Sequence, residues 1–248
     1  MYDPPGYVWA ITLAGVIAVP AVTSILLYGG GIRSGLSRGR AALLAGGAAA
    51  LFGAWFSASA VIADHGWYHT RLGHGVPWLP VAVLGFLGLL LALGRVPVVT
   101  RALTAPGTLN RLELPHTFRV AGVAFLITMA LGHLPAVFAL PAGLGDVATG
   151  LAALLVARRL ARGTGRRAAV WLNAFGLADL VVALTLGALT AYQLINVSPA
   201  GSAISLLPIA LVPTAEVPLL LTLHVTSLTA LARAPRTARR AAPTLTVA

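Results

Sequence analysis

The sequence predicts an all-α, polytopic integral membrane protein with seven transmembrane helices in one bundle. Hydrophobic residues make up 58% of the chain and charged residues only 9%. Apolar runs of about 20 residues, the length that crosses ~30 Å of hydrocarbon, recur along the sequence. Arginines fall almost entirely in the short connectors between these runs. The expected spans, which form one domain over residues 1–232, are 7–29, 41–63, 77–94, 118–139, 143–159, 168–191 and 203–231.

The distribution of arginine predicts the orientation. Sixteen of the seventeen arginines belong to alternate connectors or to the tail, and only Arg71 falls on the other side. By the positive-inside rule, the N-terminus lies outside and the C-terminus is cytoplasmic. We expect a multi-pass protein of the cell (plasma) membrane, with the Arg-rich tail 233–248 disordered in the cytoplasm. The cytoplasmic connectors contain Arg33, Arg38, Arg40, Arg95, Arg101, Arg111, Arg119, Arg158, Arg159, Arg162, Arg166 and Arg167.

The composition also excludes several classes of function. The net charge of +11 does not indicate nucleic-acid binding, because the arginines do not form a basic face with interleaved aromatic residues. The chain contains no cysteine, which excludes disulfides and thiolate chemistry. The lipid bilayer is the expected partner, and the sequence does not indicate an oligomeric state.

The first three spans carry structural signals. The first follows an N-terminus without a basic region and is too long for the core of a signal peptide. The second contains Gly46, Gly47, Ala50 and Gly53, which predict close helix packing. The third begins near Trp78, at a level where aromatic side chains favour the outer membrane interface.

The fourth and fifth spans contain two polar candidates. His133 lies in the outer third of the fourth span, and a tight turn is expected at Pro141 before the fifth. Asp146 would then open the fifth span, either as a favourable charge at a helix N-terminus or as a functional group. Across that turn His133 could meet Asp146, and both are candidate ligand-binding residues. The other interpretation of His133 is a hydrogen-bonded packing residue.

The sixth and seventh spans contain the strongest candidates, Asp179 and Glu216. Each is expected near mid-membrane depth with no arginine in the central part of its span. Carboxyl groups at this depth are costly and usually face a cavity or serve a function. Glu216 lies between Pro213 and Pro218, and prolines that break a spanning helix resemble the discontinuous helices of transporter sites. We expect the two carboxyls to share a cavity as catalytic or proton-carrying groups; the alternative is a structural role.

Further polar residues complete the predicted site. The segment Gly143-Leu-Gly-Asp146 resembles Gly176-Leu-Ala-Asp179, a four-residue match that hints only weakly at a repeat. Asn173 and His224 are additional candidate ligand-binding residues on the sixth and seventh spans.

The histidines raise the question of a metal or haem. His116 and His224 have compatible depths for a pair of axial haem ligands. In the outer loop, His65, His69 and His74 are weak candidates for a metal site. On a helix His65 and His69 would share a face, and Asp64 or His74 would complete the site, although a solvated loop is the simpler interpretation. The expected complement is no cofactor, with haem or a divalent metal as the less favoured alternatives.

Three functions remain open from the sequence. The first is transport of a small solute linked to protons or cations, with the two carboxyls loading and releasing the ion. The second is a membrane-embedded enzyme, of the acid-catalysed cyclase or isomerase type, acting on a lipophilic substrate. The third is a haem- or metal-binding membrane protein, or a receptor in which the acids are structural.

Overall fold

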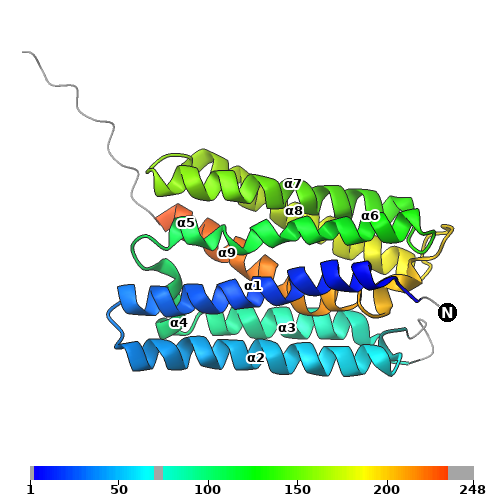
Figure 1. Ribbon diagram of the computed structural model, residues 1–248, viewed down its shortest axis with the longest axis horizontal. Helices are drawn as coiled ribbons and strands as arrows, with labels where there is room; N and C mark the ends of the chain where they lie inside the picture. Colours follow the sequence, from blue (N-terminus) through cyan, green and yellow to red (C-terminus); the bar gives the residue numbers. More distant parts are fainter. Residues whose placement is uncertain (1–2, 70–74, 234–248) are drawn as a thin grey trace, which may run out of the picture.

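The computed structural model describes residues 3–69 and 75–233, and within them the chain is helical and contains no strand. Figure 1 shows the helices running side by side along the long axis of the molecule. The elements are α1 (Gly6–Arg33), α2 (Arg38–Asp64), η1 (Trp67–His69), α3 (Trp78–Gly94), α4 (Pro97–Thr104), α5 (Leu109–Leu112), η2 (Pro115–Gly122), α6 (Val123–Ala130), α7 (Ala136–Ala161), α8 (Arg166–Ala191), η3 (Gly201–Ser205), η4 (Val212–Glu216) and α9 (Val217–Arg233).

Five of the described helices are long and apolar enough to cross a membrane: α1, α2, α7, α8 and the η4–α9 segment. A sixth candidate is the pair α3 and α4, which is bent by 80° at the break between them. The seven expected spans are therefore matched in part. The expected fourth span corresponds to η2 and α6, whose eight-residue pieces are too short to count as one long apolar helix.

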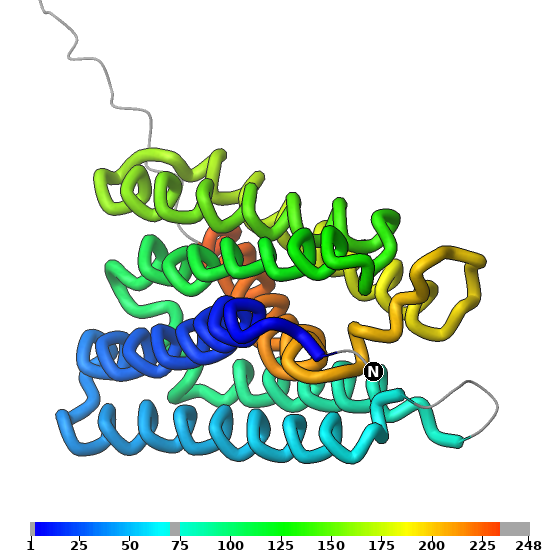
Figure 2. The backbone as a smooth tube through the Cα atoms, turned by 45° about the vertical axis from the view of Figure 1, so that its right-hand side comes forward, coloured from blue at the N-terminus to red at the C-terminus, as the bar shows by residue number. Residues whose placement is uncertain are grey.

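The bundle has two sides with a buried middle. In Figure 2, α1, α2 and α3 lie on one side, α7 and α8 lie on the other, and η2–α6 and α9 pass between them. The contacts agree with this view, since η2 packs against both α1 and α7, and α9 packs against α3 and α8. In the most hydrophobic 18-residue stretch of each helix, 61% of the residues are buried in η4–α9 but only 6% in α2. The α9 helix is therefore central in the bundle and α2 is peripheral.

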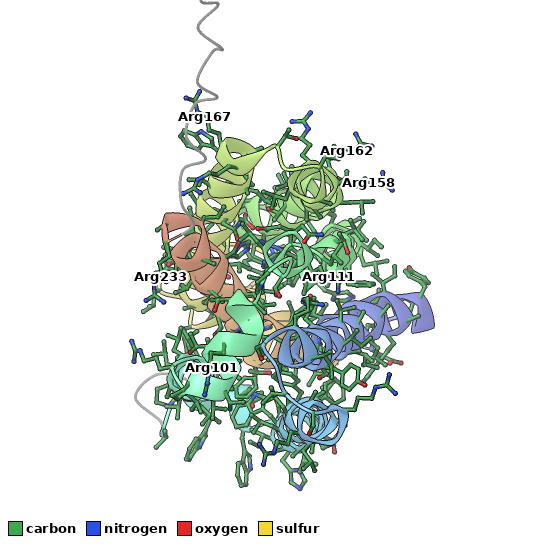
Figure 3. All side chains as sticks on the ribbon, turned by 90° about the vertical axis from the view of Figure 1, so that its left-hand side faces the viewer. Arg101, Arg111, Arg158, Arg162, Arg167 and Arg233 are labelled. Atoms are coloured by element: carbon green, nitrogen blue, oxygen red, sulfur yellow. The ribbon has the colours of Figure 1, made fainter. Side chains whose placement is uncertain are left out.

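The arginine-bearing connectors gather at one end of the bundle. Figure 3 looks onto that end, and the labelled arginines come from connectors and helix ends that are distant in sequence. They are Arg101, Arg111, Arg158, Arg162, Arg167 and Arg233. Clustering of this kind is the pattern on which the positive-inside rule depends.

The turn expected at Pro141, between the fourth and fifth spans, is wrong. The turn lies at residues 131–135, where Gly132 has a φ of +78° and Pro135 precedes α7. Pro141 lies inside α7 rather than at a turn. A proline one and a half turns into an apolar helix is tolerated when neighbouring helices surround the freed carbonyl. Gly132, which adopts the left-handed conformation, marks the turn better than Pro141 does.

The small residues of α2 do not mediate the predicted close packing. A Cβ atom placed on Gly46, Gly47 or Gly53 would meet no other atom within 4 Å. Close approach occurs instead on α1, where a Cβ on Gly30 would lie 2.1 Å from the Ala102 carbonyl oxygen of α4. Small residues in an apolar helix indicate that close packing is possible, and here the stripe on α2 faces outward.

The expected seventh span is interrupted. Residues 201–211 form the 3₁₀ helix η3 and turns, with a cis peptide bond before Pro208, and a π-helical turn, η4, precedes α9. Pro218 has no N–H to offer the Thr214 carbonyl, and the Trp55 indole of α2 donates to that carbonyl at 2.8 Å. Between Pro213 and Pro218 the helix is irregular but not broken, since the π-helical turn over residues 212–216 continues directly into α9.

Candidate functional site

A single buried arginine organises the interior of the bundle. Arg119 lies in η2 and is 1% exposed. Its Nε donates to Asp146 Oδ1 at 2.7 Å, and its Nη2 donates to Asp179 Oδ2 at 2.5 Å. One guanidinium therefore joins α7 to α8 through two charge-assisted hydrogen bonds, the strong type of hydrogen bond in proteins.

This finding corrects the prediction that Asp179 has no basic partner. From sequence, Arg119 belongs with the connector arginines because it stands where the apolar run of η2 and α6 begins. The structure carries η2 into the bundle between α1 and α7, so the guanidinium reaches the middle of the helices. The match between Gly143-Leu-Gly-Asp146 and Gly176-Leu-Ala-Asp179 now has a physical counterpart, since both aspartates bind the same arginine.

Glycines make room for both carboxylates. A Cβ on Gly145 would lie 1.8 Å from Asp179 Oδ1, and a Cβ on Gly122 would lie 2.6 Å from Asp146 Oδ2. Neither position accepts a side chain without displacing a carboxylate. These glycines therefore let α7 approach α8 and η2 closely enough for Arg119 to contact both acids.

The location of Asp146 removes the helix-terminus interpretation. Asp146 is the eleventh residue of α7, so it lies about 15 Å from the helix start at 1.5 Å per residue. Its predicted neighbour His133 is exposed in the turn before α7 and does not join this site. Asp146 is bound by Arg119 instead.

A hydrogen-bonded chain runs from Arg119 toward the arginine-rich end of the bundle. Arg119 Nη1 donates to His224 Nε2 at 3.1 Å, and His224 Nδ1 lies 2.8 Å from Asn173 Oδ1. Asn173 Nδ2 donates to the Ala169 carbonyl and to Glu113 Oε1, both at 2.8 Å. Two of the candidates from the sequence, Asn173 and His224, thus lie together next to Arg119.

The direction of these bonds defines the protonation of His224. Arginine has only donors, so His224 Nε2 must accept from Arg119. The Ala169 carbonyl orients the Asn173 amide, so its oxygen faces His224 Nδ1, which must donate. His224 is therefore the neutral tautomer with its proton on Nδ1.

His116 stacks on this histidine. The two rings have centroids 3.8 Å apart and planes 12° from parallel, and both nitrogens of His116 are buried without a hydrogen-bond partner among the described residues. Rings in face-to-face contact leave no space between them for a haem, so this pair does not fit as two axial ligands.

Glu216 approaches the cluster from α1's side of the bundle. It is 5% exposed, ends the π-helical turn η4, and has both carboxyl oxygens 3.4 Å from where a Cβ would stand on Gly15. No described residue donates a hydrogen bond to this carboxyl. It lines, with Arg119, Asp146 and Thr12, a cavity of about 10 Å³, roughly the room of one water molecule. The Thr12 hydroxyl has no hydrogen-bond partner among the described residues.

Asp146 also lines a larger, apolar cavity. It measures about 160 Å³ and is lined by side chains of α3, α6, α7, α8 and η4–α9. Asp146 and Tyr192 are the polar-ended side chains among its walls. Asp146 therefore borders both cavities, the small one that contains Glu216 and the large apolar one.

The outer histidines do not form the suggested cluster on one helix. His65 follows α2 and its Nδ1 lies 2.8 Å from the Val61 carbonyl, while His69 lies in η1 beyond Gly66 and contacts Ser205 at 2.9 Å. The described residues contain no group of three or more side chains suited to hold a metal ion. His74 and Arg71 lie outside the described residues, as does the tail 234–248.

Two groups at the ends of this interior were not anticipated. At the end opposite the arginine-rich connectors, Ser59 is hydrogen-bonded to Tyr68 at 3.0 Å and to Thr214 at 2.6 Å. At the arginine-rich end, Glu113 is fully buried and its Oε1 accepts from Asn173 and from Ser227 at 2.6 Å. Burial raises the pKa of Glu113, an effect that these two hydrogen bonds partly oppose.

Glu113 predicts a dependence of stability on pH. Because folding raises the pKa of Glu113, the carboxyl ionises in the unfolded chain above about pH 4.5 while it stays protonated in the folded protein. Ionisation stabilises the unfolded chain, so the folded protein loses stability as pH rises above about 4.5. Glu113→Gln keeps an oxygen acceptor for Asn173 and Ser227 and removes the ionisation. We expect the variant and the wild type to melt together at low pH and the variant to become the more stable as pH rises, measured in detergent. Equal melting temperatures across the range would contradict this assignment.

The fold and site define an all-helical protein with five or six candidate membrane-spanning helices and a cluster of charged side chains inside an apolar bundle. The chain belongs to the family described as "Domain of unknown function (DUF8737)", whose model matches residues 76–232. The matched segment begins just before α3 and contains Arg119, Asp146, Asp179 and Glu216, while α1 and α2 precede it. No curated protein and no solved structure matches the chain.

Proposed function

We propose that the protein transports a small solute across a membrane and that proton binding at Glu216 is linked to this transport. The observation that carries the proposal is the position of Glu216 beside the Arg119–Asp146 pair, as a buried carboxyl to which no described residue donates a hydrogen bond. Arg119 already contacts two carboxylates. A third negative charge in the same apolar interior would be strongly disfavoured by desolvation, so Glu216 carries a proton or a cation.

A proton suits Glu216 better than a metal cation. Metal cations that prefer oxygen require several oxygen ligands, whereas a proton needs only the carboxyl itself. The adjoining cavity has the size of one water molecule and polar groups at Thr12 and Glu216, which suits proton exchange. Glu216 also ends a π-helical turn, and such turns are frequent at functional sites because they interrupt the regular helix.

The proposal includes a topology. Seven crossings of a cell membrane, with η2–α6 as the fourth and the N-terminus outside, are supported by the gathering of arginines at one end of the bundle. In this arrangement Arg119, Asp146 and Asp179 lie inside the membrane. Charged side chains there are typical of ion and substrate pathways.

The test uses protein reconstituted in liposomes that contain a pH-sensitive dye. Proton movement is measured after adding small solutes under an imposed pH gradient. We expect solute-dependent proton movement in the wild type and its loss in Glu216→Gln, which removes the ionisable group at nearly constant size. The matched control is Asp64→Asn, because Asp64 is an exposed acid at the end of α2. Wild-type flux in Glu216→Gln, or no protein-dependent flux with any solute, would contradict the proposal.

The second candidate is a membrane-embedded enzyme with a lipophilic substrate. It is favoured by the apolar cavity of about 160 Å³, which brings such a substrate into contact with the Asp146 carboxyl. A protonated Glu216, which lines the adjoining small cavity, would then serve as general acid through a water molecule in that cavity. This hypothesis predicts a modified lipid in cells that express the protein and its absence in cells that express Glu216→Gln. A lipid profile unchanged by expression would leave transport as the better hypothesis.

A further inference from the structure

The apolar cavity is a pocket that follows α8. Its α8 wall begins at Leu180 and ends at Ala188, with Tyr192 just beyond the helix, a length of roughly 18 Å at 1.5 Å per residue. Leu180 is the residue after Asp179, so the inner end of the wall lies at the level of the ionised cluster. Tyr192 lies at the opposite end of α8 from the arginine-rich connector 158–167. The pocket therefore extends from the outer end of the bundle to the cluster.

The walls are apolar except at the two ends. The side chains between them come from several elements and leave no polar group to face a ligand's middle part; they include Leu79, Val83, Phe125, Phe138, Ala183 and Val217. At the inner end, Asp146 uses Oδ1 to bind Arg119. At the outer end, the Tyr192 hydroxyl is buried and has no hydrogen-bond partner among the described residues. Burial also raises the pKa of Tyr192, so its hydroxyl keeps its proton.

The ends and walls together define a class of ligand. A carboxylate group would meet the negative Asp146, and a strongly polar body would lose its hydration against the apolar walls without compensation. A hydroxyl or ammonium group can donate to Asp146, because carboxylate oxygens accept more than one hydrogen bond. A dry cavity of about 150 Å³ in another protein accepts benzene, so 160 Å³ suits a body of roughly six carbon atoms.

We propose that this pocket binds a small, predominantly apolar molecule with a hydrogen-bond donor at one end, an alcohol or amine, whose donor group contacts Asp146. That this molecule is also the transported solute rests on the proposed function. Its binding depends only on the pocket. Entry from the outer end brings the donor group to Asp146, which binds Arg119 and also lines the small cavity that contains Glu216. The occupant is thereby placed where protonation of Glu216 affects its binding.

The experiment compares three probes with the same six-carbon chain: hexan-1-ol, hexylamine and hexanoate. The melting temperature of the purified protein is measured in detergent against probe concentration. We expect saturable stabilisation by the alcohol and the amine and at least tenfold weaker binding of hexanoate. Equal binding of hexanoate, or no saturable binding of either donor probe, would overturn the proposal.

Two variants separate pocket binding from partition into the micelle. Ala183→Leu places three further carbon atoms in the pocket, and we expect it to abolish the stabilisation by hexan-1-ol. Val181→Leu is the matched control on the same helix, because Val181 is 52% exposed on the outside of the bundle. Its response should equal that of the wild type. Stabilisation that persists in Ala183→Leu would show binding elsewhere and overturn the proposal.

Glu216→Gln distinguishes a failure of this inference from a failure of the proposed function. The pocket remains intact in that variant, so the donor probes should still bind. Binding without Glu216-dependent proton movement would reject proton-linked transport and keep the pocket. Glu216-dependent proton movement without binding of the donor probes would reject the pocket as a binding site and keep proton-linked transport.

Discussion

Arg119→Met is expected to lower the stability of the protein more than any other single substitution of a polar residue in the bundle. Methionine is similar in length and apolar, so the variant leaves Asp146 and Asp179 buried without their cation. His224 also loses the donor to its Nε2. Removing one partner of a buried ion pair costs about 3–5 kcal/mol, because the remaining charge stays desolvated.

The free energy of unfolding can be compared by denaturant titration in mixed micelles. Arg101→Met is the matched control, since Arg101 is exposed on α4 and we expect a change within about 0.5 kcal/mol for a surface substitution. The triple variant Arg119→Met, Asp146→Asn, Asp179→Asn removes all three charges, and we expect it to regain more than half of the loss. Arg119→Met as stable as Arg101→Met would show that the guanidinium does not hold the bundle together.

Much of the fold could be predicted from hydropathy and arginine placement. Long apolar stretches predict helices because a backbone in lipid must satisfy its own hydrogen bonds. The boundaries of α1, α2 and α8 accordingly lie within a few residues of the expected spans. The errors occur where helices are irregular. The turn at residues 131–135 was placed at Pro141, and the first part of the seventh span was expected to be helical, because hydropathy does not distinguish a helix from a buried apolar turn.

The sequence predicts only part of the site, because it does not indicate that Arg119 lies inside the bundle. Asp179 and Glu216 are candidates because a carboxyl group deep in an apolar helix is costly, and both are buried in the interior. The further candidates Asp146, Asn173 and His224 are buried there as well. Arg119 was missed because it begins an apolar run, where arginine usually marks a membrane interface. Its position in the structure depends on η2 entering the bundle, a tertiary arrangement that local sequence does not encode. Glu113 was missed for the same reason.

The repeated pattern of glycine and aspartate was the sequence signal that could have indicated the shared arginine. Two aspartates in similar contexts on neighbouring helices suggest one shared counter-ion rather than two separate ones. In the structure the intervening glycine of the first pattern, Gly145, is the point where α7 comes closest to the Asp179 carboxylate. The identity of that residue as glycine is therefore a geometric requirement of the ion pair.

Gly145→Ala is the second substitution for which we expect a large effect. The added methyl group would lie 1.8 Å from Asp179 Oδ1 and 2.5 Å from its Cγ, so the carboxylate must move away from Arg119 or α7 must separate from α8. Overpacking of this kind costs about 1–3 kcal/mol. Gly88→Ala in α3 is the control, because a Cβ there meets nothing within 4 Å. The control should be stabilised by roughly 0.5–1 kcal/mol, since alanine is the better helix former.

A double-mutant cycle separates steric conflict with Asp179 from a general effect on helix packing. In an Asp179→Ala background the atoms that the new methyl group meets are gone, so Gly145→Ala should cost much less than in the wild type. We expect a coupling free energy of at least about 1 kcal/mol, within the range for residues in direct contact. An equal cost of Gly145→Ala in both backgrounds would mean that Gly145 is needed for the approach of the helix backbones, independently of the Arg119–Asp179 ion pair. The cycle therefore tests whether this glycine and this aspartate act as one unit.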